Sequence, residues 1–211
     1  QPGGGADGYV VQVEATPETR FHDLGIELSH QHRERLEKFL LGAEEQYRTA
    51  TILFVDINGY ATMCQKLRAE EIKDILDVYY RICTQLVDFY NGFVLEFQGD
   101  GCLAVFGAPV AYDRDAESAV RAALEIRERI LALPAMHGQT IRVSAGIETG
   151  VVLASVIRER TPHQYKIFGH PVNLAARIEG AAGPATILVG PSTWDMVKGI
   201  FVFKRRPARQ L

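Results

Sequence analysis

"GFVLEFQGDGCLAVFG", residues 92–107, predicts a β-hairpin near the middle of the chain. Two apolar runs flank Gly99, Asp100 and Gly101, and an Asp-Gly step between such runs is a strong signal for a tight turn. The hairpin carries one carboxylate in its first strand, at Glu96, and a second in its turn, at Asp100. If these acids do more than shape the hairpin, each needs partners elsewhere in the chain.

The segments around the hairpin alternate between strand and helix patterns. Upstream, "TILFVDI" at 51–57 is a continuous apolar run that ends near Asp56, which is typical of a buried strand leading into a turn. Between this strand and the hairpin, apolar residues follow the 3.6-residue period over 70–90 and predict an amphipathic helix. Downstream, the same criteria predict helices over 115–133, 171–182 and 192–198, and strands within 141–157 and over 164–168, 186–189 and 201–203. This order predicts an α+β fold with a ferredoxin-like βαββαβ core, additional strands and helices, and one mainly antiparallel sheet backed by helices.

Composition places the chain among globular proteins. Of its 211 residues, 47% are hydrophobic, which is enough for a real core. The net charge of −3 provides no strong positive field, so neither nucleic acid nor a membrane surface is expected as a partner. Cys64, Cys83 and Cys102 lie in apolar segments and indicate buried free thiols in a reducing compartment. No apolar stretch approaches the roughly 18 residues of a membrane span and no signal peptide opens the chain, so we expect a cytoplasmic location.

Asp56 and Asp100 both stand at the ends of apolar strands. In the predicted topology these strands are sheet neighbours, so we expect the two carboxylates to converge. Paired carboxylates suit Mg²⁺ or Mn²⁺ held jointly with substrate phosphates. The alternative is a structural role, in which Asp100 shapes the turn and Asp56 caps the next helix. Directly after Asp56, the residues Asn58, Gly59 and Tyr60 offer backbone N–H groups for binding a phosphate.

Asn173 and Arg177 form a second candidate set. In "PVNLAARIEG" at 171–180 they are four residues apart, so they share one face of the predicted helix. The apolar residues between them leave that face narrow and able to approach another group closely. The alternative is an ordinary pair of surface residues.

Four stretches together resemble one family: "ILFVDINGY" (52–60), "QGDGCLAVFGAP" (98–109), "RVSAGIETG" (142–150) and "YKIFGHPVNLAARIEG" (165–180). In order and spacing they are similar to the catalytic domain of class III nucleotidyl cyclases, the adenylyl and guanylyl cyclases, over residues 50–203. The resemblance implies a catalytic domain at 49–211 that converts a nucleoside triphosphate into the 3′,5′-cyclic monophosphate and pyrophosphate. It also implies a head-to-tail homodimer with two active sites at the interface, each assembled from both protomers.

The resemblance assigns roles to individual residues. Asp56 and Asp100 match the two metal-binding aspartates, with the Ile57 carbonyl as an additional ligand, and each active site would take two Mg²⁺ or Mn²⁺ ions. Asn173 matches the residue that positions the ribose. Arg177 matches the residue that stabilises charge on the reacting phosphate. The resemblance assigns no side chain as the general base.

Glu96 and Lys166 occupy the two positions that select the base in this family. Adenylyl members of the family carry a lysine at the first position and an aspartate at the second. The chain resembles them with the two charges reversed. Glu96 can accept from guanine N1–H and N2–H₂ and Lys166 can donate to O6, which predicts GTP as the substrate and cGMP as the product. Uracil presents N3–H and O4 in the same order, so UTP or CTP stays open, and so does ATP. A further alternative is that Glu96 and Lys166 simply pair with each other across neighbouring strands.

Three features depart from the family pattern. Lys166 stands where the guanylyl cyclases of animals carry a cysteine, although Glu96 matches their glutamate. His170 and Pro171 replace a charged or polar residue followed by threonine. The family usually carries a phosphate-binding lysine near the C-terminus, and Lys204 is a poor substitute for it by alignment.

Residues 1–48 are interpreted as an N-terminal extension. Within it, residues 31–48 predict a helix directly before the first catalytic strand, similar to segments that couple such domains to upstream sensor domains. A catalytically inactive regulatory module with the same fold is the main alternative to an enzyme, although both aspartates, Asn173 and Arg177 occur in one chain. An RNA-binding sheet would need basic and aromatic residues on its exposed strands, where "VLEFQGD" at 94–100 offers acids.

Overall fold

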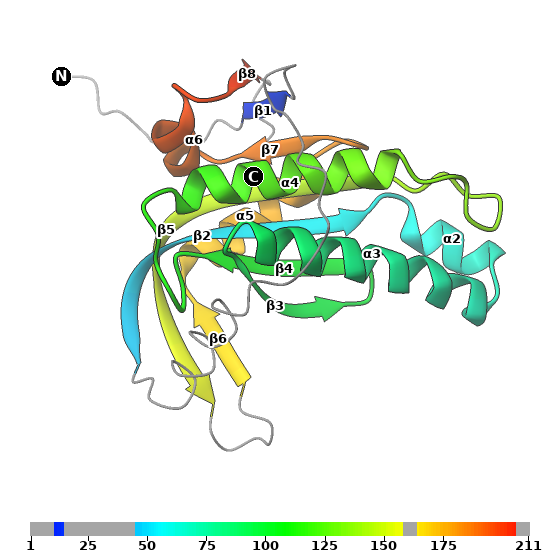
Figure 1. Ribbon diagram of the computed structural model, residues 1–211, viewed down its shortest axis with the longest axis horizontal. Coiled ribbons are helices and arrows are strands. Elements are labelled where there is room, and N and C mark those ends of the chain that lie inside the picture. The colour runs from blue at the N-terminus through cyan, green and yellow to red at the C-terminus, as the bar shows by residue number, and fades with distance from the viewer. Residues whose placement is uncertain (1–10, 15–44, 158–163, 206–211) are drawn as a thin grey trace.

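Eight strands form one sheet in the computed structural model, which describes residues 11–14, 45–157 and 164–205 (Figure 1). The elements in chain order are β1 (Val11–Glu14), β2 (Gln46–Ile57), α2 (Tyr60–Lys66), α3 (Ala69–Phe89), β3 (Phe93–Gln98), β4 (Gly101–Phe106), α4 (Asp115–Leu131), β5 (Val143–Ile157), β6 (Gln164–Phe168), α5 (His170–Gly180), β7 (Ile187–Val189), α6 (Pro191–Val197) and β8 (Val202–Arg205). The strand order is β3-β4-β2-β5-β7-β1-β8, and β6 pairs with β5 outside this path. The described pairings are antiparallel except that of β5 with β7, so the predicted, mainly antiparallel sheet is confirmed.

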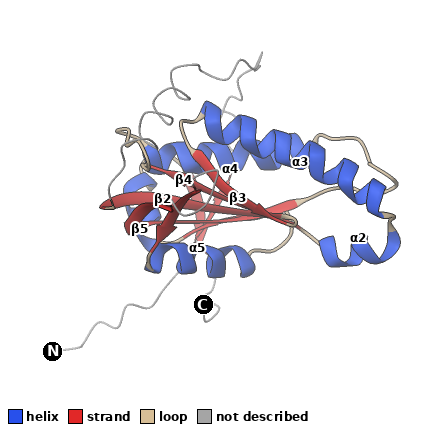
Figure 2. Ribbon diagram, turned by 90° about the horizontal axis from the view of Figure 1, so that it is seen from below, coloured by secondary structure: helices blue, strands red, loops and turns tan. Residues whose placement is uncertain are grey.

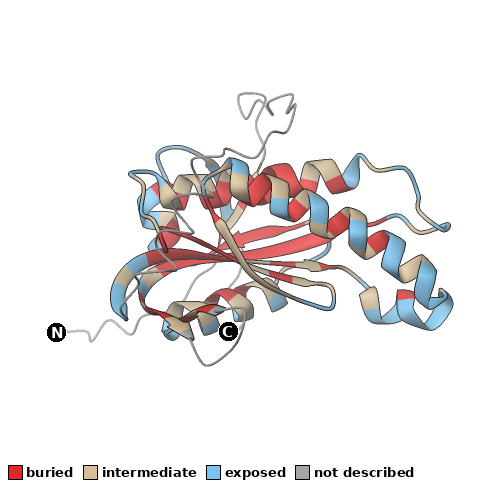
Figure 3. Cartoon of the chain, turned by 60° about the horizontal axis from the view of Figure 1, so that its bottom comes forward, coloured by how far each residue is buried: buried red, intermediate tan, exposed pale blue. Residues whose placement is uncertain are grey.

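Helices cover both faces of the sheet (Figure 2). α3 and α4 lie on one face and α5 lies on the other, which confirms the predicted α+β class. Buried residues follow the sheet and the inner sides of these helices (Figure 3). A second group of buried side chains, including Ile52, Val105, Tyr165 and Ala175, lies among the sheet, β6 and α5. Among the helices that the structure describes, none has the length and apolar character needed to cross a membrane.

α3 fixes the strand that carries Asp56. Its apolar residues recur at helical spacing, and Ile75, Tyr79 and Cys83 are among those buried. The hydroxyl of Tyr79 donates a hydrogen bond to the carbonyl oxygen of Val55 over 2.9 Å. Because Tyr79 is only 1% exposed, this bond is shielded from water. The predicted helix therefore exists, and it anchors β2 one residue before Asp56.

β2 and β5 are long strands. The N-terminal half of β2 and the C-terminal half of β5 curve together away from the rest of the sheet (Figure 1). β2 begins at Gln46 rather than at residue 51 and pairs with β5 along its whole length. β6 pairs with the outer end of β5. The curvature brings β6 close to β3 although the two strands are not neighbours in the sheet. The ring centroids of Phe93 and Tyr165, one from each strand, lie 5.9 Å apart.

The N-terminal region differs from the prediction in one place. The helix predicted over 31–48 is wrong at its end, because β2 already begins at Gln46, where pairing with β5 overrides the local preference for helix. The first part of that predicted helix, 31–44, lies outside the described residues. β1, inside the predicted extension, pairs with β7 and β8 and so belongs to the same sheet. The division of the chain at residue 48 stays a prediction.

Candidate active site

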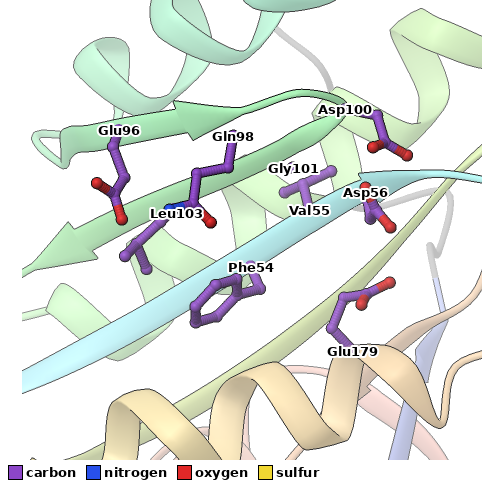
Figure 4. Close-up of a pocket in the computed structure, with 9 residues that line it drawn as sticks. All are labelled: Phe54, Val55, Asp56, Glu96, Gln98, Asp100, Gly101, Leu103 and Glu179. Carbon is purple, nitrogen blue, oxygen red and sulfur yellow. The ribbon is translucent and has the colours of Figure 1, made fainter.

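Asp56 and Asp100 lie close together at one end of the sheet (Figure 4). Asp56 is the penultimate residue of β2, and Asp100 lies in the turn between β3 and β4. β2 and β4 are hydrogen-bonded neighbours, with Val55 opposite Cys102, and this register places the two acids on adjacent strands. Gly99 takes φ 59°, in the left-handed region that favours glycine, and so permits the tight turn. The structure thus brings together the two aspartates that the sequence predicts as metal ligands.

The carboxylates at this end of the sheet perturb one another. Burial, the neighbouring carboxyl of Asp100 and the charge of Glu179 raise the pKa of Asp56 to about 7, while a hydrogen bond from the backbone N–H of Ile57 lowers it. Like charges in a partly desolvated site destabilise each other, and a divalent cation would compensate them. Carboxylate oxygens are hard ligands of the kind that Mg²⁺ and Mn²⁺ prefer, so the residues present fit such an ion. No three His, Cys, Asp or Glu side chains within the described ranges converge to hold one ion.

A pocket of about 250 Å³ extends from these aspartates along the sheet. Figure 4 shows that the carboxylates of Asp56, Asp100 and Glu179 gather at one end and that Glu96 lies at the other. Apolar side chains lie between the two ends. The lining residues are Phe54, Val55, Asp56, Glu96, Gln98, Asp100, Gly101, Leu103 and Glu179. The pocket therefore joins a strongly acidic end to the strand that carries the predicted base-selecting glutamate.

Glu96 and Lys166 form an ion pair inside one chain. Nζ of Lys166 donates to Oε2 of Glu96 over 2.7 Å, and each side chain is 34% exposed. The pair joins β3 to β6, which are not hydrogen-bonded to each other. The two residues do pair, as one alternative predicts, but the curvature of the sheet rather than strand pairing brings them together.

Asn173 and Arg177 are exposed residues of α5. Neither of them lines the pocket of its own chain. α5 packs so closely on β5 that a Cβ atom added to Gly146 would lie 2.2 Å from the backbone nitrogen of Glu179. The helix is therefore held firmly against the sheet while its Asn and Arg remain outside the pocket.

Glu179 is a pocket residue that the sequence analysis did not identify. Oγ of Ser144 donates to Oε1 of Glu179 over 2.8 Å, and Nδ2 of Asn58 donates to Oγ of Ser144 over 2.8 Å. The backbone N–H of Ala185 donates to Oδ1 of Asn58 over 3.1 Å. Burial raises the pKa of Glu179, and the Ser144 hydrogen bond acts against this rise. A chain of hydrogen bonds thus fixes this carboxylate from β5 and from the turn after β2.

The turn after β2 offers fewer groups to a phosphate than the sequence predicts. The backbone N–H of Asn58 donates to the carbonyl oxygen of Arg142 over 2.9 Å, so it is already engaged. Gly59 takes φ 78°, and α2 begins at Tyr60. The backbone N–H groups of Gly59 and Tyr60 stay the predicted phosphate-binding groups.

Two departures from the family pattern can be placed in the structure. α5 begins at His170 with Pro171 in its first turn, a position that suits proline. A Cβ atom added to Gly150 would lie 2.6 Å from Cγ of Pro171, so the proline packs directly on β5. Lys204 lies in β8, at the opposite edge of the sheet from β3, and does not line the pocket.

Residues 43–210 match the sequence profile of the adenylate and guanylate cyclase catalytic domain. The chain belongs to this family. The cyclase domain is 31% identical over 153 residues to adenylate cyclase 1 of Rhizobium meliloti (strain 1021), a match that covers 70% of this chain and 23% of that protein. It is 30% identical over 168 residues to soluble guanylate cyclase gcy-31 of Caenorhabditis elegans, which covers 77% of this chain and 24% of that protein.

A solved structure supports the same assignment. The guanylate cyclase domain of RhGC from Catenaria anguillulae, in complex with GTP, superposes with a TM-score of 0.70 at 28% identity, covering 76% of this chain and 87% of that one. The cyclase domain spans about a quarter of the length of the curated relatives named above, 23% and 24%. Because these relatives include both adenylate and guanylate cyclases, family membership establishes a nucleotidyl cyclase domain and leaves its nucleotide open.

Proposed function

We propose that the cyclase domain converts GTP into cGMP and pyrophosphate. The observation that carries this proposal is the Glu96–Lys166 ion pair. Lys166 uses Oε2 of Glu96, so Oε1 can accept from guanine N1–H or N2–H₂, and the ammonium group can donate a further hydrogen bond to O6. Adenine would place its N1 lone pair against the carboxylate and its amino group against the ammonium. Each such mismatch costs about 1–3 kcal/mol, which corresponds to tens-fold to thousands-fold discrimination.

We also propose that each active site combines two chains in a head-to-tail homodimer. A pocket of about 250 Å³ lies below the roughly 300–1,000 Å³ of complete small-ligand sites, which favours completion by a second copy. Asn173 and Arg177 are exposed and outside the pocket of their own chain, so they are free to reach the aspartates of that copy. Because Lys166 lies just before α5 in the chain, the base-selecting pair would be supplied together with Asn173 and Arg177. The Glu96 that lines the pocket beside Asp56 and Asp100 would then serve the other site of the dimer. Two-fold symmetry would make the two sites equivalent.

In the proposed reaction the ribose 3′-hydroxyl gives up its proton to water and its oxygen attacks the α-phosphorus. The bond from this phosphorus to the bridging oxygen breaks, and pyrophosphate leaves. Asp56, Asp100 and the Ile57 carbonyl would hold two Mg²⁺ or Mn²⁺ ions, which when bound lower the pKa of the 3′-hydroxyl and neutralise the leaving pyrophosphate. Asn173 would orient the ribose, and Arg177 would provide a fixed positive charge beside the α-phosphate.

A pyrimidine triphosphate is the second candidate substrate, and the same ion pair favours it. Uracil N3–H and O4 match an acceptor beside a donor in the same order as guanine N1–H and O6. We further infer a cytoplasmic location, which the three free thiols favour. Cys83 and Cys102 are buried as predicted, whereas the prediction is wrong for Cys64, which is exposed on the short helix α2. An upstream sensor domain stays a prediction.

The deciding experiment compares GTP, ATP, UTP and CTP side by side with Mg²⁺ and with Mn²⁺, with the cyclic products separated and identified by mass spectrometry. We expect cGMP to be the most abundant product and to exceed cAMP by at least about tenfold. Predominant cAMP would overturn the base assignment and leave the cyclase assignment intact. Predominant cUMP would select the second candidate. Predominant cCMP would overturn the base assignment as cAMP would, because cytosine presents an acceptor and an amino donor in the order of adenine. Absence of every product, even with Mn²⁺, would favour an inactive regulatory module.

A further inference from the structure

The acidic end of the pocket holds three carboxylates rather than the two that the sequence predicts. Glu179 of α5 lies there with Asp56 and Asp100 (Figure 4). No lysine or arginine among the described residues lines this pocket to compensate them. Three like charges around a partly buried space favour the binding of a cation.

Glu179 is held in a way that suits a residue that contacts a metal ion through water molecules. Its Oε1 accepts a hydrogen bond from Ser144, which in turn accepts one from Asn58. This chain orients the carboxylate from two other elements, and Figure 4 shows the carboxylate at the acidic end of the pocket. The three acids do not form a ligand set for a single ion, so contact through water molecules fits better than direct ligation. Carboxylates placed in this way commonly orient and strengthen metal sites.

α5 separates Glu179 from the other functional residues of the same helix. Successive residues of an α-helix are rotated by about 100°, so Glu179, two positions after Arg177, lies on nearly the opposite side. Arg177 is exposed, whereas Glu179 packs toward β5. Glu179 therefore faces the aspartates of its own chain, and Asn173 and Arg177 remain available to a second copy.

We propose that Glu179 is a positioning residue of the metal site in its own chain. It strengthens the binding of Mg²⁺ or Mn²⁺ through its negative charge and by accepting hydrogen bonds from water molecules on the ion. This inference rests on the proposed function and deepens it, because it adds a residue to the same site. The competing explanation is that Glu179 only ties α5 to β5 through Ser144.

The test measures Mn²⁺ binding to the intact, nucleotide-free chain by electron paramagnetic resonance, which reports free Mn²⁺ directly. Glu179→Gln keeps an oxygen that can accept from Ser144 and removes the charge. We expect its affinity for Mn²⁺ to fall about 10- to 100-fold, as is usual when an outer partner of a metal site is lost. A purely structural role predicts no change. The matched control is Glu148→Gln, which also removes a buried carboxylate, 4% exposed, but one that does not line the pocket.

Two further variants separate the possible failures. Ser144→Ala keeps the charge and removes the orienting hydrogen bond, so we expect a smaller loss of about two- to tenfold; unchanged affinity in both this variant and Glu179→Gln would overturn the inference. If Asp56→Asn abolishes binding while Glu179→Gln binds as the wild type does, Glu179 has no such role and the metal site stands. If the wild-type chain binds no Mn²⁺, either alone or with 3′-deoxy-GTP, the inference and the proposed metal-dependent function both fall.

Discussion

Lys166 and Glu96 are joined by a 2.7 Å hydrogen bond within one chain, although β4, β2 and β5 separate their strands in the sheet. The donor and the acceptor are therefore already oriented against each other before any base binds. Preorganised polar groups discriminate strongly between bases, because a mismatched base leaves them without hydrogen-bond partners.

Exchanging the two charges is expected to exchange the nucleotide. Glu96→Lys combined with Lys166→Asp offers a donor to adenine N1 and an acceptor to the adenine amino group. The ratio of kcat/KM for ATP to that for GTP should rise by at least about 30-fold, since two groups change from mismatched to matched at about 1–3 kcal/mol each. As a control, the ion pair of Lys198 and Asp195, 2.8 Å apart on the surface, can be exchanged in the same way and should leave the ratio unchanged. A double variant that is active and still prefers GTP would contradict this role of the pair.

The pH dependence of stability should report on Asp56. Its pKa in the folded, metal-free protein is raised from 3.8 to about 7, so the folded state holds this proton more tightly than the unfolded state does. The free energy of unfolding must therefore fall as the pH rises between these two values. In Asp56→Asn this fall should be smaller by about 1–2 kcal/mol, less than the full shift implies because solvent screens a half-buried group.

Urea denaturation in the presence of a chelator at pH 4.5 and pH 8 provides this measurement. Saturating Mn²⁺ should then stabilise the wild type more at pH 8 than at pH 4.5, because cation binding requires the ionised carboxylates. Equal pH dependence in the wild type and in Asp56→Asn would show that this carboxyl titrates normally.

Mixing two inactive variants should restore activity if each site draws on both chains. Asp56→Ala damages the half-site made of aspartates, and Arg177→Ala damages the half-site on α5. In a mixed dimer both defects fall in one site and the other site is intact, so random 1:1 mixing should recover about a quarter of the wild-type rate. The matched control mixes Asp56→Ala with Asp100→Ala, which leaves no intact site in any dimer. Failure of the first mixture to recover activity, with dimers shown to exchange, would argue for sites contained in single chains.

The close packing of α5 on β5 should depend on the absence of a side chain at Gly146. A Cβ atom there would lie 2.2 Å from the backbone nitrogen of Glu179 and 2.4 Å from the carbonyl oxygen of Ala175. Gly146→Ala is therefore expected to lower the free energy of unfolding by about 1–3 kcal/mol and to reduce turnover, because the whole helix must shift. Gly180→Ala is the control, since no atom lies within 4 Å of the added Cβ atom and alanine favours the helix. Similar stability of the two variants in urea denaturation would contradict this packing.

Local sequence patterns predicted those helices and turns whose conformation depends mainly on residues close together in the chain. α3 follows the 3.6-residue period of its buried residues, and the Gly99-Asp100 turn follows from glycine's access to positive φ. Strand pairing extends β2 back to Gln46, which no local pattern indicates. α2 has seven residues, too few to show a reliable period.

The candidate site was predictable only where a local pattern fixes the place of a residue in the sheet. Asp56 and Asp100 stand at strand ends that any such sheet places together. The contact between Glu96 and Lys166 depends on curvature of the whole sheet, which the sequence does not display. The sequence does place Glu179 on the opposite side of the helix from Arg177. The direction in which that side faces depends on how α5 packs on the sheet, so its approach to Asp56 could not be predicted.

α5 is clamped against the sheet at Gly146 and carries Glu179 on one side and Arg177 on the other. If two copies assemble as proposed, this one helix would act on the ion of one reaction centre through water molecules and on the phosphate of the other centre through Arg177. A small roll of the helix would then disturb both centres together. Such a dimer would respond to a regulatory signal at both active sites at once. Its two active sites would then show cooperative kinetics.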